Sequence, residues 1–140
     1  MLNMSVPLSG LQAKTVRLNA SANNLANMNS DGALPAAGQK SASPEPYKPV
    51  QVRQTSTGTT GGTAATVTNV HPSFVAKLDP GASYANSQGQ VAAPNVDALN
   101  ETLNVTTAKA DFTVNTKVAD AINQMVKQLF DLGIDEQPPA

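Results

Sequence analysis

The stretch from Asn95 to Leu132 constrains the fold most, because it contains neither proline nor glycine. Asn95 is the expected N-cap and Gly133 the expected end of the helix. Asp97 would lie in the first turn, where its negative charge interacts favourably with the helix dipole. The pattern predicts one unbroken helix about 55 Å long. Apolar or small residues recur in it at steps of three or four, as in a coiled-coil seam with a slight drift: Val96, Leu99, Leu103, Thr106, Ala110, Val114, Val118, Ala121, Met125, Leu129 and Leu132.

A second, shorter helix is predicted near the N-terminus, from Ser5 to Met28. Ser5 is a suitable N-cap, and Pro7 falls in the first turn, where no backbone N–H is needed. The turn-forming residues 29–32 end the helix. Its apolar seam has the same spacing as that of the longer helix: Leu8, Leu11, Thr15, Leu18, Ala22 and Leu25.

The middle of the chain, residues 33–93, cannot form long helices because prolines interrupt it. Three β-prone runs are expected there, at 47–54, 65–70 and 73–78. Residues 55–63 are rich in Gly and Thr and predict a flexible stretch, while 79–81 and 88–90 have turn chemistry. A small antiparallel sheet or hairpin is therefore expected between the two helices.

These segments predict an α+β, mainly helical fold. The expected parts are the N-terminal helix and Asn-rich turn, the β-rich insert, the long C-terminal helix and a frayed tail, at 1–32, 33–93, 94–133 and 134–140. Matching seams would let the helices pair antiparallel, like a coiled coil, with both termini at one end. Because Ala and Thr dilute both seams, two helices alone would bury little apolar surface. This favours the packing of many copies together.

The composition excludes several classes of function. The formal net charge is −1 and no basic face occurs, so nucleic acid or an anionic membrane has no electrostatic support. The absence of cysteine excludes disulfides, thiolate catalysis and common zinc knuckles. No apolar run approaches the ~20 residues that span a bilayer. Residues 1–7 lack the regions of a signal peptide, so we expect either a cytoplasmic protein or export without a cleaved signal.

Residues that carry chemistry in enzymes are sparse and scattered. His71 is the only histidine, and it precedes a proline, a setting more typical of a packing or surface residue than of a base. Asp79, Asp97 and Asp111 are too far apart in sequence to suggest a metal site. The Gly-rich residues 57–62 lack the following Lys of a phosphate-binding loop. We therefore predict no catalytic residue, no cofactor and no metal.

The most distinctive segment is 21–32, Ser-Ala-Asn-Asn-Leu-Ala-Asn-Met-Asn-Ser-Asp-Gly. Asn19, Asn23 and Asn27 lie four apart on one helical face, although Asn is a mediocre helix former. These amides either bond to neighbouring helices and set their register, as a buried polar residue does in a coiled coil, or belong to a solvated helix end. The spacing alone does not decide between these two interpretations.

This segment resembles the Asn-rich signature of flagellar rod and hook proteins, roughly Ser-x-Asn-(Ile/Leu)-Ala-Asn-x-(Asn/Ser)-(Thr/Ser)-x-Gly. Residues 24–27 match its centre and Gly32 its end. Residues 90–97 are similar to the strand and Pro-Asn-Val turn before the last helix of proximal-rod proteins, especially the FlgC type. Residues 107–118 are similar to that helix, except that Phe112 follows an Asp where the family usually has Tyr next to Glu. Such departures fit a divergent paralogue.

The resemblance implies a structural subunit of the bacterial flagellar basal-body rod and not an enzyme. Its implied partners are further copies of itself, other rod proteins and the flagellar type III export apparatus. It also implies export without a cleaved signal and assembly in the periplasm, with the terminal helices lining a hollow cylinder. The residues expected at the assembly interface are Leu8, Leu11, Leu18, Asn23, Asn24, Leu25, Asn27, Gly32, Leu99, Leu103, Phe112, Asn115, Val118, Met125 and Leu129.

A second interpretation, from a different class, is a soluble helical-hairpin adaptor or a type III secreted binding protein. It would use the same seam to hold one partner, and it predicts a well-ordered monomer or dimer with a defined stoichiometry. The rod interpretation instead expects helices that become ordered on assembly. The Ala- and Thr-rich seam over so long a helix favours the rod.

Overall fold

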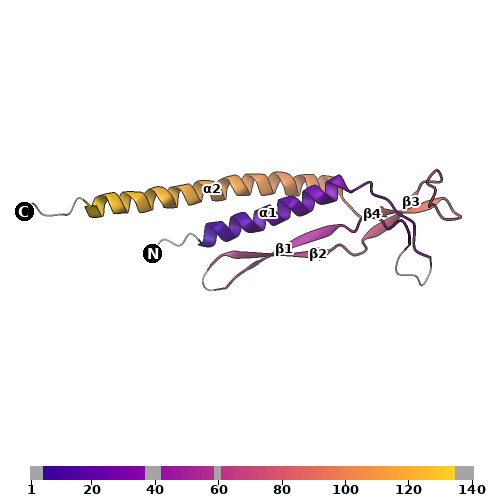
Figure 1. Cartoon of the computed structure of the whole chain (residues 1–140), viewed down its shortest axis with the longest axis horizontal. Helices are drawn as coiled ribbons and strands as arrows, with labels where there is room; N and C mark the ends of the chain where they lie inside the picture. Colours follow the sequence, from indigo (N-terminus) through magenta and orange to yellow (C-terminus); the bar gives the residue numbers. More distant parts are fainter. Residues whose placement is uncertain (1–4, 37–41, 59–60, 135–140) are drawn as a thin grey trace, which may run out of the picture.

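The computed structural model describes residues 5–36, 42–58 and 61–134. It shows an elongated molecule in which α1 and α2 run side by side in opposite directions (Figure 1). The elements in chain order are α1 (Ser5–Ala26), β1 (Val50–Ser56), β2 (Thr63–Asn69), β3 (Phe74–Leu78), β4 (Gln90–Pro94) and α2 (Ala98–Ile134). The predicted α+β, mainly helical fold with antiparallel terminal helices is confirmed.

The two helices meet through small side chains. Ala13 and Ala20 on α1 are 2% and 8% exposed, and Ala108 on α2 is 1% exposed. Gly10 lies so close to Asn115 that a Cβ at Gly10 would be 3.2 Å from the Asn115 Oδ1 atom. The size of the side chains at a contact sets the distance between helix axes, so these residues allow a close approach.

The predicted apolar seam of α2 does not form this contact. Leu99 and Leu103 are 71% and 56% exposed. At about 100° per residue, Leu103 lies about 140° around the helix from Ala108. The seam was therefore assigned to the wrong face for pairing with α1. The physical reason is that small and polar residues on the inner face allow a closer approach than leucines would.

α1 lies between α2 and the β1–β2 hairpin (Figure 1). The hairpin is antiparallel and pairs Val50 with Asn69 at its open end. Half-buried and exposed residues alternate along the first part of β1, as expected for a strand with one covered face. Residues 55–56 and 63 belong to the strands, so the predicted flexible stretch is shorter than expected, and residues 59–60 lie outside the described ranges.

β3 and β4 form a second antiparallel sheet, which is separate from the β1–β2 hairpin. β4 is the most buried strand, with Val91 and Ala92 at 0% exposure. Gly32 donates its N–H to the Ala92 carbonyl at 2.9 Å and accepts from the Ala92 N–H at 2.8 Å. A Cβ at Gly32 would collide with backbone atoms of Pro44 and Pro46. The chain leaving α1 therefore docks on β4 at a position where only glycine fits.

Asp97 caps α2, in place of the predicted Asn95. The Asp97 Oδ1 atom accepts the N–H groups of Leu99 and Asn100 at 3.0 and 3.1 Å. Asn95 instead donates its amide to the Pro72 carbonyl at 2.9 Å. An Asp at the cap adds a negative charge to the positive end of the helix dipole, whereas an Asn would not.

The other element ends differ slightly from the predictions. α2 continues through Gly133 to Ile134, and residues 135–140 of the predicted tail lie outside the described ranges. α1 ends at Ala26, shortly before the predicted end, and Pro7 lies in its first described turn. β1 begins at Val50, and the preceding residues form the contacts with α1 described below.

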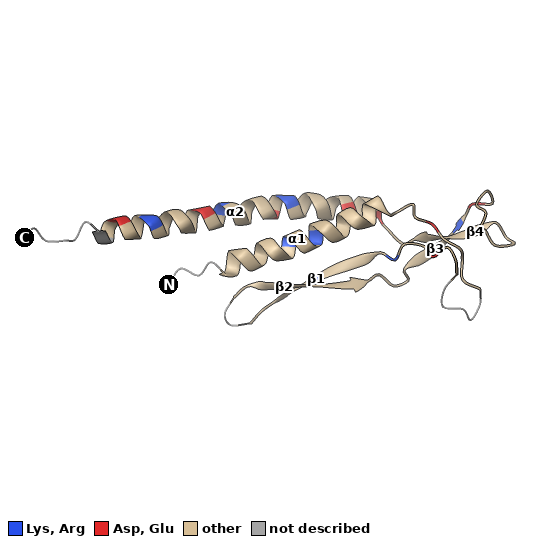
Figure 2. Cartoon of the chain, viewed as in Figure 1, with Lys and Arg blue, Asp and Glu red and all other residues tan. Residues whose placement is uncertain are grey.

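Charged residues are sparse, and their signs alternate along α2 (Figure 2). No helix in the described ranges is both long enough and apolar enough to cross a bilayer. Near the exit of α1, Lys77 Nζ forms an ion pair with Asp31 Oδ2 at 2.9 Å, which ties β3 to the chain that follows α1.

The close helix contact predicts the effect of enlarging Ala108. Ala108→Leu should lower the free energy of unfolding by about 1–3 kcal/mol, because the larger side chain overpacks the space against α1. Ala110→Leu is the matched control, since Ala110 is exposed on the same helix, and it should change the free energy by no more than about 0.5 kcal/mol. Urea unfolding followed by circular dichroism measures both, and equal midpoints would contradict the close packing.

Candidate assembly interface

Asn24 is the polar centre of the fold. It is 1% exposed, and its side chain makes four hydrogen bonds. The Nδ2 atom donates to the Val50 carbonyl at 2.7 Å and to Glu101 Oε1 at 2.6 Å. The Oδ1 atom accepts from the Val50 N–H at 3.1 Å and from the Tyr47 hydroxyl at 3.0 Å. An amide has two donors and two acceptor lone pairs, so Asn24 is fully satisfied while it joins α1, β1 and α2.

Tyr47, in the loop before β1, and Glu101, on α2, both support this amide. The second oxygen of Glu101, Oε2, accepts from the Asn104 Nδ2 atom at 3.3 Å, so both carboxylate oxygens have partners. Burial raises the pKa of the Tyr47 hydroxyl above its ordinary value, and the negative charge of Glu101 raises it further. Both effects disfavour the phenolate, which keeps the hydroxyl available as a donor to Asn24.

Two contacts farther along the helices maintain the same register. Lys14 Nζ forms an ion pair with Asp111 Oδ2 at 2.6 Å, and Gly10 lies against Asn115. As the position moves from 24 to 14 to 10 on α1, its partner moves from 101 to 111 to 115 on α2, as antiparallel helices of equal rise require. The ion pair is partly exposed, so it contributes more to register than to stability.

The residues predicted at the assembly interface differ in burial. Asn24 and Gly32 are buried inside the chain and present no side-chain surface to a neighbour. The half-buried members are Leu11, Leu18, Leu25, Asn27 and Asn115. The exposed members are Leu8, Asn23, Leu99, Leu103, Phe112, Val118, Met125 and Leu129. Only the exposed members are fully available for contact with another molecule.

Asn19, Asn23 and Asn27, which we call the Asn ladder, do not join the two helices of the chain. Asn19 and Asn23 are exposed, and the Asn27 amide donates to the Asn23 carbonyl at 2.9 Å within its own helical region. The amide that does bond to α2 is the adjacent Asn24, on a different face of α1. Contact between the ladder and a neighbouring molecule stays a prediction.

Most exposed large apolar residues of α2 follow the predicted seam, which here forms an outer stripe, whereas Phe112 and Phe130 lie off it. We define this outer stripe as Leu99, Leu103, Val114, Val118, Met125, Leu129 and Leu132. At about 100° per residue, it begins on the side of α2 opposite Ala108 and stays within about a third of the helix circumference. An exposed apolar stripe along a helix of this length is typical of a surface that contacts another protein.

α2 also extends past the start of α1 (Figure 1). Since Gly10 lies against Asn115, the first described residues of α1 lie opposite about position 120 of α2, given equal rise. Residues 121–134, the projecting end, therefore have no described element beside them. Met125, Leu129, Phe130 and Leu132 on this end are 51–68% exposed.

Several residues that hold the helices together were missed from the sequence, namely Ala13, Lys14, Ala20, Tyr47, Glu101 and Ala108. A signal was present in α1, because Gly10, Ala13, Arg17, Ala20 and Asn24 repeat at helical spacing. This stripe was overlooked because the leucines beside it have the same period and greater hydrophobicity. For Tyr47, which lies outside regular structure, no local pattern pointed to the contact.

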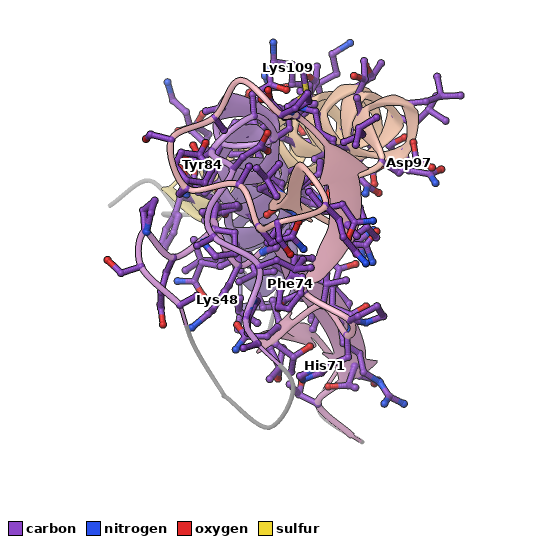
Figure 3. The ribbon with its side chains drawn as sticks, turned by 90° about the vertical axis from the view of Figure 1, so that its right-hand side faces the viewer. Lys48, His71, Phe74, Tyr84, Asp97 and Lys109 are labelled. Atoms are coloured by element: carbon purple, nitrogen blue, oxygen red, sulfur yellow. The ribbon has the colours of Figure 1, made fainter. Side chains whose placement is uncertain are left out.

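The ionisable side chains that Figure 3 labels do not gather at one place. Figure 3 shows Lys48, His71, Asp97 and Lys109 on different parts of the molecule. Within the described ranges, no group of three or more His, Cys, Asp or Glu residues is placed to hold a metal ion. The apolar outer stripe and the projecting end are thus the surfaces that most need a functional account.

Comparison with known proteins identifies the family. The family model for flagella basal body rod proteins matches residues 4–33, the segment that contains α1 and ends just past Gly32. Over 130 residues the chain is 31% identical to the flagellar basal-body rod protein FlgC of Escherichia coli O6:H1, covering 89% of this chain and 91% of that protein. The chain belongs to the FlgC family. FlgC of Salmonella typhimurium is 30% identical with the same coverage.

Membership of the FlgC family makes this chain a structural subunit of the flagellar basal-body rod, as the resemblance implied. The relatives are rod proteins by name, which agrees with the prediction that the chain is not an enzyme. In this FlgC-type chain, the stretch matched by the family model includes both Asn24 and Gly32. Each has a defined structural role, one as the satisfied amide between helices and the other as the close contact with β4.

The Asn24 network predicts a large difference between two adjacent asparagines. Asn24→Ala leaves the Val50 N–H, the Tyr47 hydroxyl and a Glu101 oxygen each short of a buried partner, so the free energy of unfolding should fall by about 3 kcal/mol or more. Asn23→Ala is the matched control and should change it by no more than about 0.5 kcal/mol, because Asn23 is exposed. Chemical unfolding of both variants tests the network, which similar losses would contradict.

The raised pKa of Tyr47 predicts a loss of stability in alkali. Below about pH 10 Tyr47 is protonated in both the folded and the unfolded state. As the pH rises further, the unfolded state loses its proton first, so the free energy of unfolding falls. The Tyr47→Phe variant should lose the part of this pH-dependent decrease in the free energy of unfolding that Tyr47 causes, whereas the Tyr84→Phe variant should keep it. Unfolding measured between about pH 8 and pH 11 checks this; equal slopes in the Tyr47→Phe variant and the wild type would contradict it.

Proposed function

We propose that this FlgC-type chain self-assembles with further copies and with other rod proteins, through its outer stripe and projecting end, into the hollow drive shaft of the flagellum. The observation that carries the proposal is the outer stripe, because it leaves leucine, valine and methionine side chains of α2 exposed in the single chain. Each such side chain contributes about 1.5–3 kcal/mol when fully buried. A row of them along one helix favours repeated lateral contacts over a stable monomer.

The arrangement of the other elements supports assembly. The chain holds its own helices together with Ala, Gly and a polar network, so its apolar side chains stay available for neighbours. The β3–β4 sheet lies at the end of the molecule opposite the projecting end (Figure 1). In our proposal it packs between adjacent subunits, while the Asn-rich turn after α1 sets how those subunits dock.

The setting we propose is the proximal rod, in the periplasm, reached through the flagellar type III export apparatus. Support for it comes from the family, since the relatives are named as basal-body rod proteins. In the assembled rod we expect α1 and α2 to lie along the inner wall of the cylinder and to be ordered fully by their neighbours. An elongated subunit with both helices parallel to its long axis suits a stiff tube.

The first test is genetic and structural. Deletion of this gene should leave basal bodies that retain the membrane ring but lack the rod and filament, as seen by electron microscopy of the purified structures. Leu129→Glu should then restore rods at least about tenfold less well than wild type, because a charge buried in an apolar contact costs more than about 1.4 kcal/mol. Gln128→Glu, on an exposed neighbouring position, is the matched control and should restore them fully.

The outcomes separate the two classes of function. Intact, functional flagella in a deletion strain without a paralogue would exclude the rod role and favour the adaptor. Capture of one partner through α2, at a fixed stoichiometry, would then support the adaptor. Leu129→Glu that assembles as well as Gln128→Glu would show that the outer stripe is not the contact surface.

A further inference from the structure

A polar pocket of about 240 Å³ lies where α1, β1 and α2 meet. Arg17 and Ser21 reach it from α1, Gln51 from β1, and Glu101 and Asn104 from α2. It lies next to the Asn24 network, which uses Glu101 and the backbone of Val50. The proposed function assigns no role to this pocket.

Arg17 is the cation of the pocket, and it has no ion-pair partner in the described part of the chain. The Nε atom of Arg17 is buried and has no hydrogen-bond partner. Glu101 lines the same pocket, but its two oxygens already accept from Asn24 and Asn104. A partly buried guanidinium without a counter-ion is unfavourable, and a carboxylate is the group whose two oxygens match its planar donors.

We propose that this pocket receives the carboxylate of Asp131 from the projecting end of a second copy of the chain. This inference rests on the proposed function, because it requires copies that assemble. Asp131 is exposed and makes no ion pair among the described residues. It lies between Phe130 and Leu132, both 68% exposed, so docking this end would also cover apolar surface.

The pairing must be between molecules. Glu101, at the pocket, and Asp131 lie on the same straight helix, separated by about 45 Å at 1.5 Å per residue. No rotation of side chains closes such a gap. Most other acidic side chains of the described ranges are already engaged: Asp31 with Lys77, Glu45 with Lys48, Asp97 with the start of α2, and Asp111 with Lys14. Asp131 is the acid on the projecting end, the part of the helix without a described neighbour.

A charge exchange tests the pairing in assembled rods of the full-length chain. Arg17→Glu and Asp131→Arg should each lower incorporation at least about tenfold, within the coupling measured for close charge pairs at interfaces. The double variant Arg17→Glu/Asp131→Arg should recover to within about twofold of wild type, because the pair is restored with its signs reversed. Arg53→Glu and Asp120→Arg are the matched controls and should assemble normally, since both residues are exposed and lie outside the pocket.

A covalent probe identifies the partner. The chain has no cysteine, so Gln51→Cys/Leu132→Cys places one thiol at the pocket and one beside Asp131. Oxidation of purified basal bodies should give disulfide-linked multimers of this chain, and Arg17→Glu should reduce them at least about tenfold. Cross-links to another rod protein alone, no rescue by the double variant, or a loss with Arg53→Glu equal to that with Arg17→Glu would overturn the proposal. If the wild-type chain enters rods normally in the same experiment, the proposed function stands even where this pairing fails.

Discussion

The buried amide of Asn24 is the interaction on which the rest of the fold depends. A buried amide is unfavourable unless its donors and acceptors all find partners, and Asn24 finds them on α2, on β1 and on Tyr47. Each element is therefore held in position by the same side chain. A chain with only 4% aromatic residues has few large side chains from which to build a core. A satisfied polar network supplies the specificity that a large apolar core supplies elsewhere.

This constraint divides the surfaces of the helices by chemistry. The inner faces are small or polar, with Ala13, Ala20 and Ala108 at the contact and Lys14 paired with Asp111. The leucines, together with Val114 and Val118, are left on the outside of α2. A monomer built this way gains little from burial of apolar side chains within itself. Under the proposed assembly, its stability would be linked to the concentration of its neighbours by mass action. The assembly that we propose would give this division of surfaces a reason.

Much of the architecture followed from the sequence. The proline-free run after Asn95 could only be a long helix, and the prolines of the middle region allowed only short strands and turns. The Asn-rich segment led to the rod family through its resemblance, which the comparisons support over most of the chain. The N-cap of α2 was predicted wrongly, because Asp97 and not Asn95 caps the helix. Asn95 instead donates its amide to the Pro72 carbonyl, a contact that no local pattern encodes.

The sequence by itself determined the number of helices, their length and the periodicity of their apolar residues, because these follow from local backbone preferences. Only the tertiary structure decided which face of each helix turns inward. Periodicity marks an apolar stripe but does not say whether the stripe meets its own chain or another. Asn24 on α1 contributes to that choice, because its partner Glu101 on α2 lies far away in sequence and becomes a neighbour only when the chain folds.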